Sequence, residues 1–101
     1  MSEYHLEKTP MKVRAHIIVS GMVQGVFFRA RTMNRAVNFG VNGWIRNLSD
    51  GRVEAVFEGE EEGVNSLVEF CRHGPSNAVV TNVELTWENY SGEFQEFKIR
   101  H

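Results

Sequence analysis

Hydrophobic and polar positions alternate along several segments of the chain, which is the pattern of strands with one buried face. Residues 13–20 show this alternation first. Residues 41–48 predict a second strand and residues 52–58 a third, and Asp50-Gly51 between them is a hairpin turn signal. Later apolar positions predict a fourth strand and a short fifth one; these positions are Val79, Val83, Leu85 and Trp87, then Phe97 and Ile99.

Between the strands, apolar residues recur at helical spacing. Ala30, Met33, Val37 and Gly40 repeat at steps of three and four, with Ala36 beside them, and predict an amphipathic helix that ends at Gly40. A second helix is expected before Gly74-Pro75, and the glutamates Glu60, Glu61 and Glu62 favour its N-terminus through the helix dipole. The buried stripe expected for this helix consists of Val64, Leu67, Val68 and Cys71.

The predicted order is strand, helix, strand, strand, helix, strand, followed by the short strand. This is the split βαβ, ferredoxin-like pattern of an α+β sandwich, in which two helices cover one face of an antiparallel sheet. We expect the first and third strands to be adjacent and parallel, so the loop after the first has no reason to meet the turn before the third. Residues 1–10 have no periodicity and are expected to form a mobile tail, which leaves residues 11–101 as one domain.

The stretch Gly21-Met22-Val23-Gln24-Gly25-Val26-Phe27-Phe28-Arg29 joins the first expected strand to the first expected helix. Its two glycines permit backbone conformations that point several N–H groups at one spot. The helix start adds free amides and the positive end of a dipole, and Arg29 adds a planar fork that matches two phosphate oxygens. The stretch therefore predicts a cradle for a small phosphate group. It is neither a Walker A motif nor a dinucleotide fingerprint, because it lacks Gly-Lys-Ser/Thr and a third glycine.

Two stretches carry a resemblance to a known family. The segment from Val19 to Arg29 resembles the first signature of the acylphosphatases, and Gly43-Trp44-Ile45-Arg46-Asn47, followed by Gly51, Val53 and Gly59, resembles the second. The resemblance extends from Met11 to the end of the chain, and Ile45 stands where the family usually has a smaller residue. It implies the same ferredoxin-like fold and an enzyme that hydrolyses the carboxyl–phosphate bond of small acyl phosphates to carboxylate and inorganic phosphate, with no metal or organic cofactor.

The resemblance also implies which residues act. Arg29 would grip the substrate phosphate, and Asn47 would orient the attacking water, which an amide can do because it both donates and accepts. Taken alone, Arg29 is typical of a solvated helix arginine and Asn47 of a turn residue. Gln24 fits either a loop-stabilising amide or part of the site wall. The backbone amides expected around the phosphate belong to Val23, Gln24, Gly25, Val26, Phe27, Phe28 and Arg29.

The remaining reactive side chains fit structural roles better. The four histidines have no metal-ligand spacing, the three glutamates at 60–62 mark a helix start, and the single cysteine belongs to a buried stripe. Two serines have no adjacent base that could activate them. His16 is expected on the outward face of the first strand, where it could border the site. These residues are His5, His16, His73 and His101, Cys71, Ser20 and Ser49.

Composition fits a small domain of the cytoplasm. The net charge of -2 over 101 residues gives no reason to expect nucleic acid as a partner. No apolar run is long enough to cross a membrane, and the N-terminus has no signal peptide pattern. A single cysteine is typical of a reducing compartment. The expected partners are a small acyl phosphate and the product phosphate, and the expected state is a monomer.

A non-catalytic module that binds a phosphorylated ligand or a partner is the main alternative, because ferredoxin-like sheets are widely reused. An RNA-binding version needs exposed aromatics on the central strands. The outward positions of the first and third strands include none; they are Arg14, His16, Ile18, Arg52, Glu54, Val56 and Glu58. A second alternative is an acylphosphatase-like domain that serves a larger maturation or carbamoyl-transfer enzyme, and we expect instead that the chain acts alone.

Overall fold

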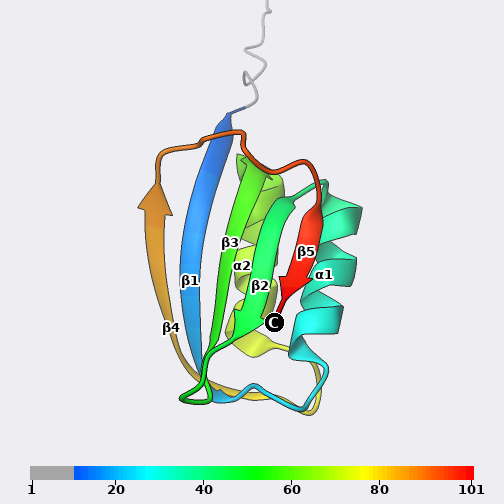
Figure 1. Cartoon of the computed structure of the whole chain (residues 1–101), viewed down its shortest axis with the longest axis vertical. Helices are drawn as coiled ribbons and strands as arrows, with labels where there is room; N and C mark the ends of the chain where they lie inside the picture. The colour runs from blue at the N-terminus through cyan, green and yellow to red at the C-terminus, as the bar shows by residue number, and fades with distance from the viewer. Residues whose placement is uncertain (1–10) are drawn as a thin grey trace, which may run out of the picture.

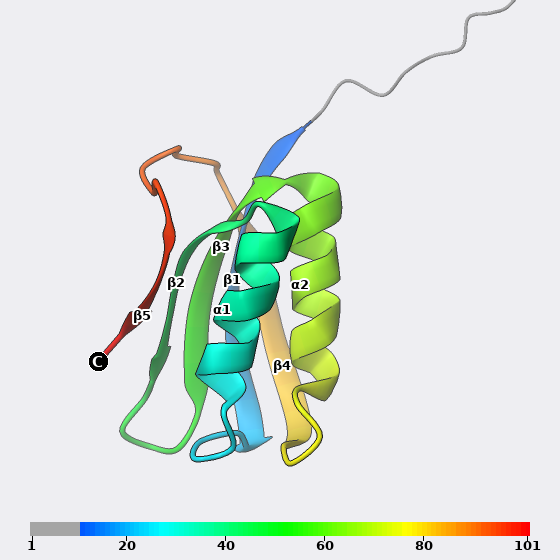
Figure 2. The same cartoon turned by 90° about the vertical axis from the view of Figure 1, so that its right-hand side faces the viewer.

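The computed structural model describes residues 11–101, so the expected tail at residues 1–10 lies outside the described part of the chain. Five strands form one sheet in the order β4-β1-β3-β2-β5, and both helices cover the same face of it (Figure 1, Figure 2). The elements are β1 Lys12–Met22, α1 Phe28–Phe39, β2 Asn42–Asn47, β3 Val53–Glu60, α2 Glu61–His73, β4 Val79–Glu88 and β5 Phe97–Arg100. The predicted α+β, ferredoxin-like sandwich is confirmed, with every expected element present.

Strand directions differ from the expectation at two places. β1 and β3 are adjacent but antiparallel, with Val19 opposite Val53, so the prediction of a parallel pair was wrong. The β2–β3 hairpin makes β3 antiparallel to β2, and α1 connects β1 to β2 so that these two strands run in the same direction. β3 lies between them and is therefore antiparallel to both. The end of β1 therefore lies beside the start of β3. β5 pairs with β2 in parallel, which makes the sheet mixed at this edge.

The core lies between the sheet and the two helices. Alternate residues of the central strands enter it, and α2 contributes the stripe that the sequence predicts. Burial of each aliphatic side chain stabilises the fold by about 1.5–3 kcal/mol relative to leaving it exposed. The packed layer therefore holds the strands and helices in place, and with them the ends at which the loops begin. Among the buried side chains are Ala15, Ile17 and Val19 on β1, Val53, Ala55 and Phe57 on β3, and Val64, Leu67, Val68 and Cys71 on α2.

The buried face of α1 is not the one that the periodicity predicts. Phe28, Thr32 and Ala36 are buried, whereas Val37 is 68% exposed and Ala30 is also exposed. Phe28 explains the rotation, because its ring enters the core and lies with its centroid 6.5 Å from that of Phe70 on α2. With Phe28 fixed at the first turn, residues four and eight positions later share its face.

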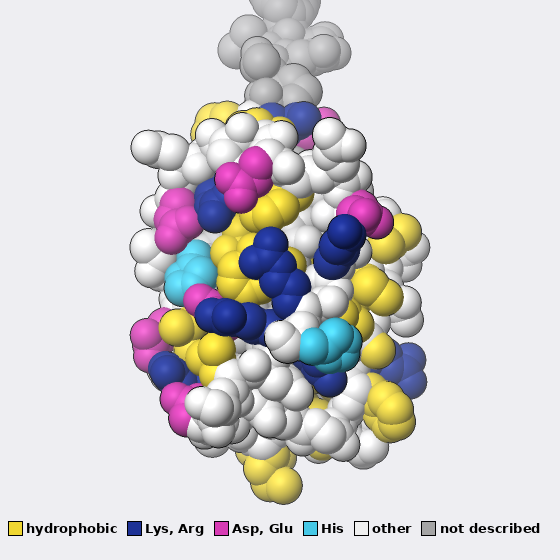
Figure 3. All heavy atoms as spheres, in the orientation of Figure 1, with side chains coloured by type: hydrophobic (Ala, Val, Ile, Leu, Met, Phe, Trp, Pro, Cys, Tyr) yellow, Lys and Arg dark blue, Asp and Glu magenta, His cyan; other side chains and the backbone are white. Residues whose placement is uncertain are grey.

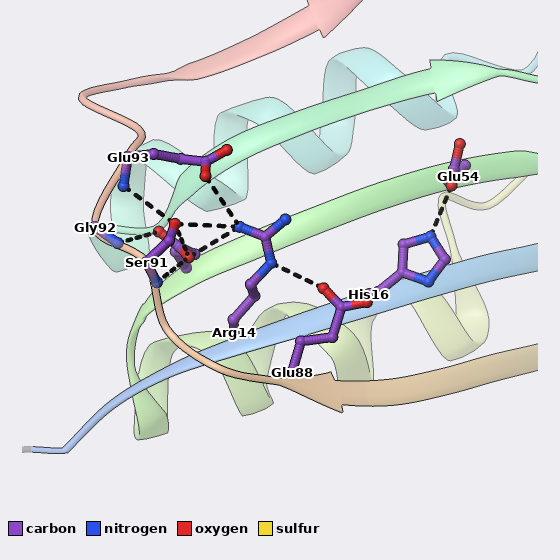
Figure 4. Close-up of polar contacts among 8 residues, drawn as sticks. Arg14, His16, Glu54, Glu88, Ser91, Gly92 and Glu93 are labelled. Atoms are coloured by element: carbon purple, nitrogen blue, oxygen red, sulfur yellow. Dashed lines mark hydrogen bonds and ion pairs between the residues drawn. The ribbon is translucent and has the colours of Figure 1, made fainter.

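The open face of the sheet carries a network of polar contacts that joins Arg14 to Glu88 and to residues 91–93 (Figure 4), with Glu58 as a shared partner. The Glu58 side chain is only 2% exposed, because the chain between β4 and β5 covers it. Ser91 donates to its carboxylate through both N–H and hydroxyl at 2.8 Å, Gly92 N–H donates at 3.1 Å, and Arg14 Nη1 donates at 3.0 Å. Arg14 also binds Glu88 at 2.9 Å. This network fastens the β4–β5 connection to the sheet.

Elsewhere on this face Lys and Arg side chains gather around apolar ones (Figure 3). The Trp44 ring lies beneath two guanidiniums, with Arg46 at 5.5 Å and Arg100 at 4.6 Å from its centroid. Trp44 is therefore a sheet-face aromatic held by cation–π contacts. Within residues 11–101, neither helix combines the length and the apolar character that crossing a membrane requires.

Candidate active site

Three segments meet at the end of the sheet where β1 and β2 finish. The loop at residues 23–27 leaves β1 there, and the hairpin at residues 48–52 leaves β2 (Figure 1). β5 packs against α1, and Ile99 and His101 at its end line the same hollow as the first residues of α1. Figure 2 shows β5 along the edge of the sheet, next to β2. The sequence expectation that the loop and the hairpin have no reason to meet is corrected here, because the antiparallel β1–β3 pair brings them together.

The loop at residues 23–27 owes its shape to residues with positive φ. Gly25 has φ 76°, and Phe27 has φ 65°, which is rare for a residue with a bulky side chain. Gly21 has φ 124° at a bulge between β1 and β4, where a Cβ would stand 2.1 Å from the carbonyl oxygen of Val79. Glycine is therefore required at position 21 for space, and at position 25 for backbone conformation alone.

Within residues 11–101, no side chain caps the N-terminus of α1. Phe27 is the N-cap residue and offers no side-chain hydrogen bond, and the first turn contains no acidic residue. In α2, by contrast, Glu61 and Glu62 occupy the first turn. Free amides and the positive dipole end of α1 are therefore available to an anion at the loop.

A hollow of about 350 Å³ opens at this end of the molecule. The loop and the start of α1 form one side of it, through Val23, Gly25, Phe27, Phe28, Arg29 and Ala30. The end of β2 contributes Asn47, and the chain at and after β5 contributes Ile99 and His101. Among the described residues, no Asp or Glu side chain lines the hollow, and Arg29 is the one Lys or Arg on its wall.

Arg29 and Asn47 lie on the wall of this hollow, although they belong to different elements. Arg29 is the second residue of α1 and Asn47 the last of β2, and both are half-buried. Within residues 11–101, neither side chain makes a hydrogen bond or an ion pair with another protein group. Two half-buried polar side chains without internal partners face one cavity, which is the arrangement of groups that bind a ligand.

Gln24 connects the loop to the hairpin. Its Nε2 donates to the carbonyl oxygens of Leu48 at 2.8 Å and Arg52 at 2.9 Å. Of the two roles that its sequence position allows, these contacts favour a stabilising amide, and the Gln24 side chain is not among the groups that line the hollow. Because Leu48 follows Asn47 directly, these two hydrogen bonds connect the loop to the chain next to the residue expected to hold water.

Comparison with known proteins bears on what this site does. A family model described as Acylphosphatase matches residues 15–99. The chain belongs to the acylphosphatase family. It is 55% identical over 89 residues to the acylphosphatase of Syntrophus aciditrophicus, covering 88% of this chain and 93% of that one, and 58% identical over 79 residues to that of Haloarcula marismortui, covering 78% and 87%.

A solved acylphosphatase structure agrees with the fold. The crystal structure of acylphosphatase from Bacillus subtilis superposes with a TM-score of 0.84 at 35% identity, covering 88% of this chain and 99% of that one. The resemblance inferred from the two signatures is thereby confirmed, as are the hydrolase class and the hydrolysis of acyl phosphates. As an acylphosphatase, the protein cleaves an acid anhydride between a carboxyl group and phosphate.

Several ionisable side chains outside the acylphosphatase signatures lie away from the hollow. His16 lies on the open sheet face, where its Nε2 is 2.7 Å from Glu54 Oε2, and it does not line the hollow. Burial alone would raise the pKa of Glu54, but hydrogen bonds from His16 and Arg46 lower it. Cys71 is buried beside Thr32, and burial raises the pKa of its thiol to about 12. These groups therefore have structural surroundings rather than contact with the hollow.

Two residues on the hollow were not expected there. Ile99 was expected only as a marker of the fifth strand, and His101 only as a histidine without metal-ligand spacing. Their place depends on β5 pairing in parallel with β2, which no local pattern in a four-residue strand encodes. Within residues 11–101, no three His, Cys, Asp or Glu side chains are grouped as a metal site would need.

Proposed function

We propose that Arg29 and the backbone amides of residues 23–29 hold the phosphate of a small acyl phosphate, while Asn47 positions the water that attacks it. The observation that carries this proposal is that Arg29 and Asn47 line one hollow and have no partner within the described chain. The amides at the start of α1 complete the anion site, since neither a capping side chain nor an acidic residue occupies it.

The leaving group explains why these few residues are sufficient. The carboxylate released from an acyl phosphate has a conjugate acid with a pKa of about 4, so it departs without receiving a proton. Phosphoryl transfer then requires charge neutralisation and a water in line with the leaving oxygen. Arg29 and the amides supply the first requirement, and Asn47 supplies the second by orientation, because an amide is a poor base.

The proton of the attacking water passes in this scheme to an oxygen of the substrate phosphate itself. His16, the histidine considered as a border of the site, lies on the open sheet face instead and has Glu54 as its partner. The expected pH–rate profile is therefore flat near neutrality. A profile that loses its ionisation in His16→Ala would contradict this assignment of the proton.

The test is hydrolysis of benzoyl phosphate by the wild type and by Arg29→Ala and Asn47→Ala, with and without a chelator. We expect losses in kcat of about 10²–10³-fold for Arg29→Ala and about 10²-fold for Asn47→Ala, with no effect of the chelator. Arg31→Ala is the matched control, because Arg31 is an exposed arginine on the same helix and does not line the hollow. Folding of each variant is checked by thermal unfolding.

A folded wild type without activity would support the alternative of a non-catalytic phosphate-binding module. A loss in Arg31→Ala equal to that in Arg29→Ala would show that charge on α1, rather than contact with phosphate, is what matters. Arg29→Lys separates these possibilities further, because lysine keeps the charge but loses the bidentate fork.

We also propose that the enzyme is a cytoplasmic monomer that does not bind nucleic acid. The single cysteine, fully buried at Cys71, fits a reducing compartment. Trp44, an aromatic ring on the open sheet face, already has the guanidinium groups of Arg46 and Arg100 over it, so a base would have to displace a guanidinium. Gel filtration at two protein concentrations, with and without an RNA oligonucleotide, tests the monomeric state and the absence of RNA binding.

A further inference from the structure

The hollow is larger than a phosphate group requires. A tetrahedral phosphate needs on the order of two to three times the ~30 Å³ share of a water molecule, whereas the hollow measures about 350 Å³. This volume lies in the range of about 300–1,000 Å³ that is typical of sites for whole small molecules. Space therefore remains beside the phosphate position for the acyl group of the substrate.

The wall of this remaining space is mainly apolar. Phe27 stands at the loop and leaves 71% of its surface exposed, which places a phenyl ring in water next to the anion site. Ala30 is exposed on the first turn of α1, and Ile99 on β5 is half-buried. His101 is the polar group of this side. These residues come from two elements that face each other, so an acyl group between them would contact both walls.

The conformation of Phe27 adds to this observation. Its φ of 65° is unfavourable for a residue with a bulky side chain, and a residue that is 71% exposed gains little from burial in the folded protein. The backbone conformation serves the loop, but glycine would adopt it more readily. A ligand that covers the ring would compensate for both costs, because apolar surface of the ring and of the ligand would leave water together.

We propose that Phe27, Ala30 and Ile99 form an acyl subsite that selects acyl phosphates with bulky apolar acyl groups over acetyl phosphate. This inference rests on the proposed function, since it assigns the substrate class of the same site. The subsite acts on substrate binding and on the orientation of the carboxyl–phosphate bond, and it leaves the chemistry of phosphoryl transfer to Arg29 and Asn47.

The experiment compares kcat/KM for cyclohexanecarbonyl phosphate and acetyl phosphate. Both leaving groups are aliphatic carboxylates of similar basicity, so the ratio of the two constants reports the size of the acyl group rather than its reactivity. We expect the wild type to prefer the larger substrate by about tenfold or more, because several additional CH₂ groups leave water on binding. Phe27→Ala should reduce this ratio by roughly fivefold or more.

Ala30→Leu provides a second variant that fills the subsite instead of emptying it. Leucine is a good helix former at an exposed helix position, so the variant should fold, and it too should lower the ratio. Val37→Ala is the matched control, because Val37 is an exposed apolar residue of the same helix outside the hollow and should keep the wild-type ratio. Thermal unfolding confirms that each protein is folded.

The outcomes separate the subsite from the function itself. A wild type that hydrolyses both substrates with similar kcat/KM, and variants with the same ratio, would overturn the acyl subsite while the proposed function stands. Hydrolysis of neither substrate by folded wild type would overturn the function and the subsite together. A wild-type preference that disappears equally in Val37→Ala would also overturn the assignment to Phe27 and Ala30.

Discussion

Replacement of Gln24 by methionine tests whether the two halves of the site are held at a fixed distance by one side chain. Gln24 belongs to the loop proposed to bind phosphate, and its amide donates to Leu48 and Arg52 in the hairpin that follows Asn47. Methionine has a similar length and shape but cannot donate these hydrogen bonds. The variant therefore removes the connection while the half-buried space remains filled.

The size of the effect follows from the partners that remain. A neutral hydrogen bond contributes about 0.5–1.5 kcal/mol net to stability. Neither carbonyl is orphaned in the variant, because Leu48 O still accepts from Gly51 N–H at 3.2 Å and Arg52 O from Leu48 N–H at 2.8 Å. We therefore expect the free energy of unfolding to fall by about 1–2 kcal/mol for the two bonds together. In a domain of this size that corresponds to a decrease in Tm of about 4–16 °C.

The catalytic effect should exceed the loss of stability. If the loop and the hairpin separate, water at Asn47 and phosphate at Arg29 lose their alignment, and a displacement of about 1 Å can cost about 10²-fold in rate. Inhibition by inorganic phosphate should change little, because Arg29 and the amides that are proposed to bind it lie on one side of the connection. The measurements are urea unfolding followed by tryptophan fluorescence, kcat with benzoyl phosphate, and the inhibition constant of phosphate.

Two results would refute this reasoning about Gln24. A loss of stability with unchanged kcat would mean that the hydrogen bonds hold the fold without setting the geometry of the site. Equal weakening of phosphate inhibition and of kcat would mean that the loop itself is deformed, since an interaction lost only in the transition state leaves ground-state binding intact.

Two further predictions concern groups away from the hollow. Burial opposes ionisation of Glu58, but Ser91, Arg14 and Gly92 together lower its pKa below the ordinary 4.5, so ionised Glu58 stabilises the fold above that pH and less as pH falls through the folded-state value. Glu58→Gln should therefore reduce the free energy of unfolding by about 1–3 kcal/mol at pH 7 and by less at pH 3, and an equal loss at both pH values in urea titrations would contradict this. Cys71, with a pKa of about 12, holds about a thousandfold less thiolate than an exposed thiol, so a disulfide reagent at pH 8 should modify it only after unfolding, and rapid labelling of the native enzyme would disprove its burial.

The sequence predicted the elements of the fold well because their periodicity is strong and local. The alternation at residues 13–20 and the stripe of α2 are direct consequences of burial on one face, and the structure has both. The stripe of α1 was misjudged because Phe28 had been assigned to the loop. Once its ring enters the core, it rotates the helix and buries Thr32 in place of Val37. A polar residue such as Thr32 gives no hydrophobic signal of its burial.

The features that the sequence did not reveal depend on contacts between distant segments. Glu58 was expected on the outward face, and it is there, but its burial depends on residues 91 and 92 closing over it. The carbonyls that Gln24 reaches belong to a turn 24 to 28 residues later. No periodicity or turn signal carries such information, since it resides in how two loops approach each other at the end of a sheet.

Strand direction explains why this site can exist at all. β3 is antiparallel to both β1 and β2, so β1 and β2 point the same way on either side of it and release their chains at the same end. α1 follows β1 directly, which places its free N-terminus at that end, and β5 runs parallel to β2 and brings Ile99 there as well. The residues proposed to contact phosphate, to position water and to contact the acyl group therefore lie at or after the carboxyl ends of three different strands. Because Ile99 and His101 belong to this edge of the sheet, the parallel β2–β5 pair is the feature on which the proposed acyl selectivity depends.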